Sequence, residues 1–97
     1  MMQEMDRQAE KAYKQINELI TPEVIALFIE KQKDYTATFL LTGQKGVFSD
    51  INRKFWKLYR GVYQGKELTM EKSEEVCKDM IGHLFLMIYC LREGIEG

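Results

Sequence analysis

The pattern of apolar and polar positions is clearest between residues 70 and 93. Apolar side chains recur there three or four positions apart, the spacing of one face of an α-helix. They are Val76, Cys77, Met80, Ile81, Leu84, Met87, Ile88 and Leu91. Gly94 follows directly after this pattern, and glycine commonly ends a helix. The pattern predicts a long helix from about Thr69 to the residue before Gly94, with a broad face in the core.

The chain before this segment predicts three further helices. Residues 1–20 carry a narrow apolar stripe among many charges, typical of an amphipathic helix. A second helix is expected from Thr21 to residue 33 or 35, since Thr21 suits an N-cap and Pro22 the first helical position. A third is expected over residues 50–63, capped by Ser49 and ended by Gly65. Its expected core positions are Ile51, Phe55, Leu58, Tyr59 and Val62.

Residues 36–48 interrupt the helical pattern. They combine three threonines and two glycines with a short apolar run. We expect a loop whose apolar residues tuck into the core, and a loop of this length in a small domain is often functional. A plain connector is the alternative interpretation.

Composition indicates a single all-α domain over residues 1–97. The chain has one proline and no repeat or linker, and its common residues favour helices. A net charge of -1 argues against a binder of nucleic-acid polymers, which usually has a strong basic excess. One chain of 97 residues buries only a modest core, so we expect a homo-oligomer.

The two cysteines indicate a reducing compartment. Cys77 and Cys90 fall in one expected helix, about 20 Å apart along its axis, whereas a disulfide needs Cα atoms about 6 Å apart. Free thiols and a charged amino terminus without an apolar signal region favour a cytoplasmic protein. The apolar run from Met80 to Leu91 is too short to span a bilayer, so no membrane partner is expected.

Two pairs of acids suggest a metal site. Glu30 and Asp34 lie one helical turn apart, as do Glu75 and Asp79, so each pair shares a helix face. Four carboxylates around a gap would suit Mg²⁺, which prefers oxygen ligands and substrate phosphates. The alternative is that these acids are ordinary solvated side chains.

A basic stripe on the expected third helix suggests a phosphate site. It contains Arg53, Lys54 and Lys57, with Asp50 at its start. Such side chains can hold the phosphates of a nucleotide, although a solvated helix face is the alternative. His83, the single histidine, is expected to be a hydrogen-bonded packing residue.

Three runs in this order carry a family resemblance: FIEKQKDYTATF, GVFSDINRKFWKLYRG and EKSEEVCKDMIGHLFLMIYCL. Over residues 24–92 the chain resembles a nucleotide-modification-associated domain of phage and bacterial genomes. That family is near the MazG-like all-α nucleoside triphosphate pyrophosphohydrolases. Residues matching its motifs are Lys31, Asp34, Tyr35, Asp50, Arg53, Lys54, Lys57, Glu71, Glu75 and Asp79.

The resemblance implies a four-helix MazG-like bundle completed by oligomerisation, and a Mg²⁺-dependent cleavage of a nucleoside triphosphate. It assigns catalysis to Glu75 and Asp79, and the metal to these two residues with Glu30 and Asp34. Substrate contacts would come from Lys31, Tyr35, Asp50, Arg53, Lys54 and Lys57.

Three departures from the family pattern keep alternatives open. The acids are four positions apart rather than three, Thr36 replaces a glycine, and His83 replaces a tyrosine. A non-catalytic, phage-type binder that sequesters a signalling nucleotide is therefore the second hypothesis. A helical protein–protein interaction module is the third.

Overall fold

The computed structural model describes residues 2–34, 37–65 and 70–97, apart from the side chains of Met2, Met70 and Glu71. All regular structure in these residues is helical, which confirms the all-α prediction. The elements are α1 (Met2–Gln15), a π-helical turn η1 (Ile16–Ile20), α2 (Thr21–Asp34), α3 (Phe39–Tyr63) and α4 (Met70–Glu93). No described helix has the length and apolar character needed to cross a membrane.

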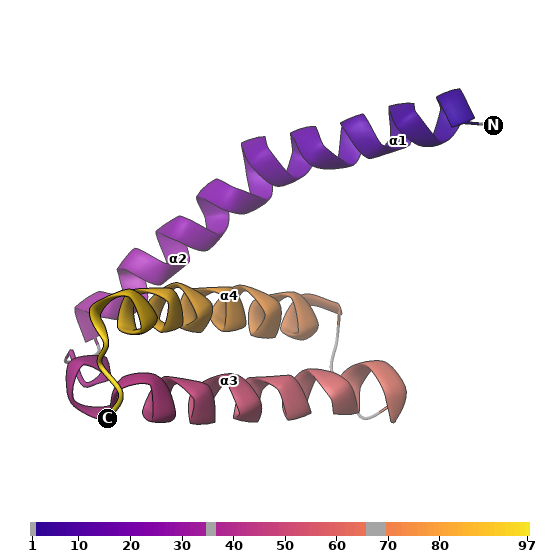
Figure 1. The fold of residues 1–97 in the computed structure, drawn as a ribbon. Coiled ribbons are helices and arrows are strands. Elements are labelled where there is room, and N and C mark those ends of the chain that lie inside the picture. Colours follow the sequence, from indigo (N-terminus) through magenta and orange to yellow (C-terminus); the bar gives the residue numbers. More distant parts are fainter. Residues whose placement is uncertain (1, 35–36, 66–69) are drawn as a thin grey trace.

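Helix α4 lies in the middle of the molecule (Figure 1). Helix α3 runs along one side of it and α2 crosses the other side. Helix α1 continues beyond α2 as an arm that projects away from this three-helix body (Figure 1). The arm accounts for the elongated dimensions of 50 × 32 × 23 Å.

The second helix has the predicted bounds, Thr21–Asp34, but Thr21 does not cap it, because the arm and α2 form one bent rod. Thr21 has helical angles (φ -58°, ψ -49°), and its N–H donates to the carbonyl of Ile16, five residues back. Pro22 explains the wider turn, because a proline inside an α-helix clashes with the carbonyl four residues earlier and donates no hydrogen bond. A threonine followed by a proline is typical of a helix start, and the same two residues also occur here within a continuous helical rod. The sequence alone therefore does not distinguish the two cases.

Helix α3 begins eleven residues earlier than the prediction, which placed its cap at Ser49 and a loop over residues 36–48. Residues from Phe39 onward are helical, with one break at Gly43 (φ 60°, ψ -152°). The helix restarts because the C-terminal tail caps it: Gln44 N–H donates to the carbonyl of Ile95 (2.9 Å), and Lys45 N–H donates to that of Glu96 (3.4 Å). A contact between chain segments so distant in sequence leaves no local signal.

The predicted helix ends at Gly65 and Gly94 are confirmed. Both glycines have positive φ (59° and 66°) directly after a helix. Beyond Gly94, the N–H of Ile95 donates to the carbonyl of Cys90 at 2.9 Å, which closes the last turn of α4. This turn directs the tail toward the break at Gly43.

The core of a single copy is small. Among the described residues, the buried apolar side chains are Val24, Val47, Val76 and Cys90, one from α2, one from α3 and two from α4. The rings of Phe28 and Phe85 pack edge to face at 5.5 Å between α2 and α4. Both cysteines are free, as predicted.

Many side chains expected in the core remain exposed. On α3 these include Phe55, Tyr59 and Val62, contrary to the prediction. Half of the expected apolar face of α4 is also open to solvent: Ile81, Leu84, Ile88 and Leu91. The two neighbouring helices cover two sides of α4 and leave the third side bare.

Candidate ligand site

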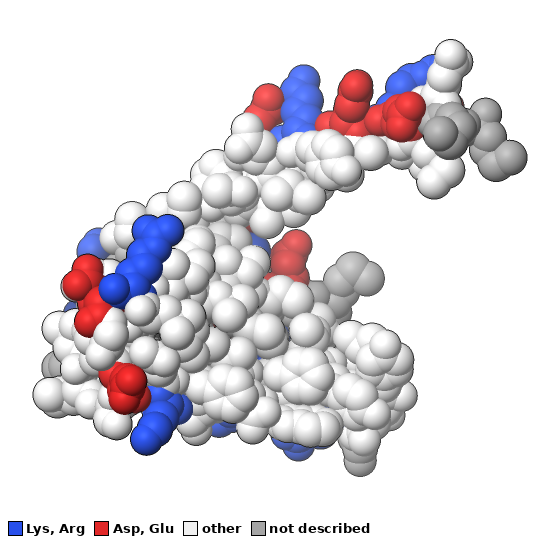
Figure 2. All heavy atoms as spheres, viewed as in Figure 1, with Lys and Arg blue, Asp and Glu red and all other residues white. Residues whose placement is uncertain are grey.

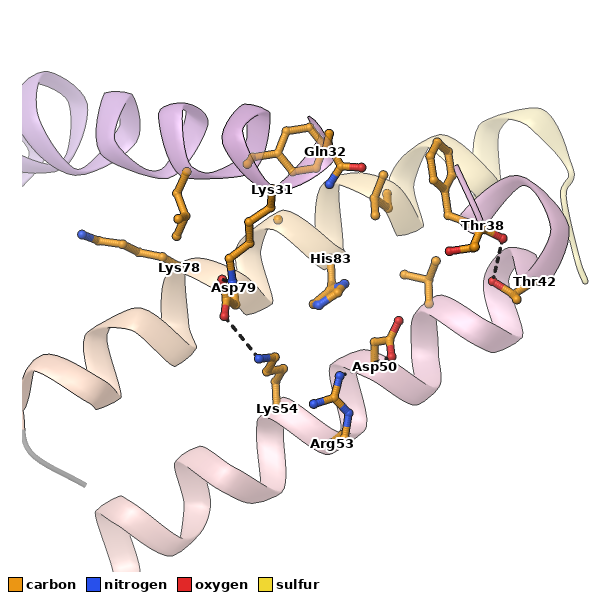
Figure 3. A pocket seen from close by; sticks show the side chains of 16 residues that line it. Lys31, Gln32, Thr38, Thr42, Asp50, Arg53, Lys54, Lys78, Asp79 and His83 are labelled. Carbon is orange, nitrogen blue, oxygen red and sulfur yellow. Dashed lines mark hydrogen bonds and ion pairs between the residues drawn. The ribbon is translucent and has the colours of Figure 1, made fainter. Parts of the chain in front are cut away.

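A pocket of about 320 Å³ lies between α2, α3 and α4 (Figure 3). Charged side chains gather at one end, and Thr38 and Thr42 lie at the other (Figure 3). Its volume is at the lower end of the range of about 300–1,000 Å³ for small-molecule sites.

Asp79 of α4 is the centre of the charged end. One carboxylate oxygen accepts a short hydrogen bond from Lys31 Nζ of α2, and the other accepts from Lys54 Nζ of α3 at 3.2 Å. The Asp79 and Lys54 side chains are only 12% and 15% exposed, whereas Lys31 is 36% exposed. Three helices thus contribute one charge each to a cluster with an excess of one positive charge.

The two lysines determine the ionisation of Asp79. Burial alone would raise the pKa of this carboxyl, but the hydrogen bonds from Lys31 and Lys54 outweigh it and hold the pKa below its ordinary value. Asp79 is therefore a carboxylate at neutral pH.

A second ion pair lies beside the cluster. Arg53 donates to Asp50 at 3.5 Å, three residues earlier on α3. Lys78 also borders the pocket, but its ammonium group pairs with Glu23 of α2 at 3.2 Å and points away from Asp79 (Figure 3). The groups that face the interior are three cations and two carboxylates, so the pocket is positive in a chain of net charge -1.

His83 lies one helical turn after Asp79, in the middle of the pocket (Figure 3). Burial lowers the pKa of its imidazole, as do Lys54 and Arg53, while Asp50 and Asp79 oppose this effect. The net result is a pKa below 6.5 and a neutral ring at pH 7. A neutral imidazole can both donate and accept a hydrogen bond.

Apolar side chains line the rest of the pocket. Leu27 and Phe28 come from α2, Phe39 and Val47 from α3, and Leu86 from α4. Gly82 permits close packing, since a Cβ at this position would lie 3.2 Å from a ring carbon of Phe28.

Four residues predicted to contact substrate meet in this pocket. Lys31, Asp50, Arg53 and Lys54 all line it, together with Asp79. Lys57 is exposed on α3 and does not line the pocket. Tyr35 lies outside the described residues.

The four acids predicted to bind metal are not brought together. Glu30 is exposed and pairs with Lys33 at 3.4 Å, and Asp34 and Glu75 are exposed away from the pocket. Asp79 already accepts from two ammonium groups. Within the described residues, no group of three or more acidic, histidine or cysteine side chains is arranged to hold a metal ion. The donor set therefore does not fit the four-acid Mg²⁺ site, and we derive no chemistry through that ion.

Sequence reasoning missed some of the lining residues. Gln32, Thr38, Thr42 and Lys78 were not predicted, and His83 was expected only to pack. Helical spacing contained part of the signal, because Gly82, His83 and Leu86 follow Asp79 at three, four and seven positions.

Comparison of the chain with protein-family models, curated proteins and solved structures found no match. The function is therefore argued from the pocket.

Proposed function

We propose that this protein binds a small phosphorylated molecule, in the simplest case a nucleotide, without cleaving it. The observation that carries the proposal is the pair Lys31 and Lys54 converging on the single carboxylate of Asp79 inside a pocket. Two ammonium groups and one carboxylate leave one positive charge without a counter-charge. A phosphate group would complete the neutralisation.

The chemistry of phosphate suits this end of the pocket. A phosphate has several acceptor oxygens, and Lys31 and Lys54 each retain ammonium hydrogens beyond the one donated to Asp79. Asp79 holds both ammonium groups in place before a ligand arrives, which lowers the entropic cost of binding. Arg53 and the neutral ring of His83 offer further donors nearby.

The remainder of a nucleotide would fit the uncharged end. Phe39, which follows Thr38 in the chain, offers an apolar surface for a base, and Thr38 and Gln32 offer hydrogen bonds to its edge or to a sugar. A mostly apolar site with a few polar groups is the usual form of a small-molecule pocket.

The arrangement supports binding more than hydrolysis. A pyrophosphohydrolase of the type suggested by the resemblance needs carboxylates free to hold metal, and Asp79 is occupied by lysines while Glu30, Asp34 and Glu75 lie elsewhere. Mg²⁺-dependent cleavage and kinship with the MazG-like enzymes remain predictions. A cytoplasmic location also remains a prediction, consistent with the two free thiols.

The test is a thermal-shift screen of nucleotides, including cyclic and hyperphosphorylated ones, with and without Mg²⁺, followed by chromatography of each ligand that binds. We expect a ligand that raises Tm and is recovered intact. Recovery of a monophosphate only when Mg²⁺ is present would replace the binder with a pyrophosphohydrolase. If no phosphorylated ligand changes Tm, the proposal is wrong.

Matched lysine variants locate the binding. Lys54→Gln should weaken the best ligand at least about tenfold, because it removes one ammonium group from a partly buried site. Lys57→Gln removes the same charge from the exposed face of α3, one turn further on, and should change affinity little. Equal effects of the two substitutions would indicate general electrostatic attraction instead of a site at Asp79.

A further inference from the structure

The arm has no packing partner within its own described chain. Helix α1 contacts only the adjoining turn η1, and its side chains are almost all exposed. The radius of gyration is 16.0 Å, against about 12.5 Å for a compact chain of this length. An isolated helix of 14 residues is marginally stable in water, so α1 needs another surface.

One side of the arm has the pattern of a helix-packing seam. Met5, Ala9, Ala12, Ile16 and Leu19 alternate at four and three positions, and we call these residues the arm seam. Its charged residues lie on the outer side of the helix: Glu4, Arg7, Glu10, Lys11, Lys14 and Glu18. In Figure 2 the coloured charges stand along the outer edge of the arm, and the side that faces the body is white.

Helix α4 offers a second seam with the same spacing. Ile81, Leu84, Ile88 and Leu91 alternate at three and four positions and are 37–58% exposed; we call them the α4 seam. They occupy the side of α4 that neither α2 nor α3 covers. Between Met80 and Leu91 the one ionisable imidazole or charged side chain of α4 is His83, and a helical segment that is apolar on nearly every side is normally buried on every side, so this third side also needs a helix against it.

We propose that the arm seam of one copy packs antiparallel on the α4 seam of a second copy, and reciprocally, to form a closed two-fold dimer. In the described structure no residue of α1 contacts α4 of its own chain, so the α4 seam is left uncovered within one copy. In a dimer with two-fold symmetry, the arm seam and the α4 seam of both copies would be covered, so no seam would remain open to a further copy.

The two seams match residue by residue in one register. With Ala9 opposite Leu91, Ala12 falls opposite Ile88. In the same register Ile16 falls opposite Leu84; Leu19 lies in the wider π-helical turn η1, so the α-helical register is followed only as far as Ile16. The small alanines of the arm thus face large side chains of α4, which permits close helix packing.

Charge favours the antiparallel direction. Asp6 is the one charged residue directly beside the arm seam, and Arg92 is the one directly beside the α4 seam. In the antiparallel register they fall within about 3 Å of each other along the helix axis and on the same side of the helix pair. A parallel arrangement would place them at opposite ends.

The proposal is tested on the full chain by light scattering coupled to size-exclusion chromatography. The wild type should have twice the 11.5 kDa mass of one chain. Ala12→Glu and Ile88→Glu, one in each seam, should each raise the dimer Kd at least about 100-fold, since a charge would be buried without a partner. Lys11→Glu is the control, because it places the same acid on the outer side of the arm, and it should leave the dimer intact.

Far-ultraviolet circular dichroism verifies that each variant is folded.

A cross-link tests the register independently of stability. When an Ala9→Cys chain is mixed with a Leu91→Cys chain under mild oxidation, a disulfide-linked pair of 23 kDa (twice 11.5 kDa) should form. A Glu10→Cys chain, with its thiol on the outer side, should not cross-link with Leu91→Cys. The proposal is overturned by a wild-type monomer at 100 µM, by a dimer that neither seam substitution weakens, or by equal cross-linking of both pairs.

Discussion

Asp79 accepts hydrogen bonds from two lysines while lying largely out of solvent. Removing one member of such a cluster leaves the others without a full set of partners, and for partly buried charges this is costly. The cluster therefore joins three helices and also determines which ligands the pocket favours. Its contribution to folding can be measured apart from ligand binding.

Asp79→Asn should lower the free energy of unfolding by about 2 kcal/mol at pH 7, because two charge-assisted hydrogen bonds are weakened. The pKa of Asp79 is below its ordinary value in the folded state, so its contribution is fully present above about pH 4 and is lost as the pH falls further. Urea unfolding of both proteins from pH 7 to pH 2.5 should show the difference shrinking below pH 4. A difference that stays constant would mean that the carboxylate charge is not what stabilises the fold.

His83 reports on the pocket because it is the single histidine of the chain. Its pKa is lowered on folding, so the folded protein loses stability as the pH falls below about 6.5. A phosphate bound beside it should raise this pKa, since the added negative charge favours the imidazolium form. NMR titration of the one imidazole signal, with and without the best ligand, measures the shift.

The same titration in Lys54→Gln is the control. The ligand should then shift the His83 pKa much less at equal concentration, because less of it is bound. A ligand that raises Tm without moving the His83 pKa would have to bind elsewhere.

Among the elements, α4 was predicted well and the start of α3 was not. The long 3–4 repeat and Gly94 define α4 through local signals, and the structure agrees with them. The restart of α3 after Gly43 depends on a tail about 50 residues away in sequence, whose carbonyls accept from the N–H groups of Gln44 and Lys45. The bent rod at Pro22 was missed for a related reason, since proline suits both the start of a helix and a π-helical turn.

Gly43→Ala should destabilise the protein by about 1–3 kcal/mol from backbone strain alone. An added Cβ would also lie 2.6 Å from both the backbone nitrogen of Gly97 and the carbonyl oxygen of Ile95, so the tail would be displaced. Gly65→Ala is the control, because its φ is similar (59°) but no atom lies within 4 Å of the added Cβ. Urea unfolding should give the larger loss for Gly43→Ala; equal losses would show that the tail contact contributes nothing.

For the whole molecule, helical periodicity identifies faces but not which faces meet. The basic stripe indicated Arg53 and Lys54, the acid spacing indicated Asp79 and the family resemblance indicated Lys31, and these four residues do share one pocket. Periodicity also paired Glu30 with Asp34 and Glu75 with Asp79. Each pair does share a helix face, but of these four acids only Asp79 lines the pocket. A buried carboxylate needs a positively charged partner, but the sequence does not say whether that partner is a metal ion or a lysine. For Asp79 the partners are Lys31 and Lys54.

In a two-fold dimer, the thermal stability of the fold would depend on the protein concentration. Because dimer formation stabilises the folded state by mass action, the wild-type Tm should rise as the protein is concentrated from 1 to 100 µM. Ala12→Glu should make Tm independent of concentration over this range. A wild-type Tm that does not change would argue that each copy is stable alone, with its arm uncovered.

Because Cys90 is completely buried, the rate at which its thiol reacts reports how often this part of the structure opens. Its thiol is 0% exposed between α3 and α4 and lies 3.8 Å from the carbonyl oxygen of Phe39, whereas Cys77 on the same helix is partly accessible. A thiol reagent should label Cys77 at once, but Cys90 only when α3 separates from α4. The delay between the two labelling events measures how often the walls of the pocket open, without any fluorophore, mutation or denaturant.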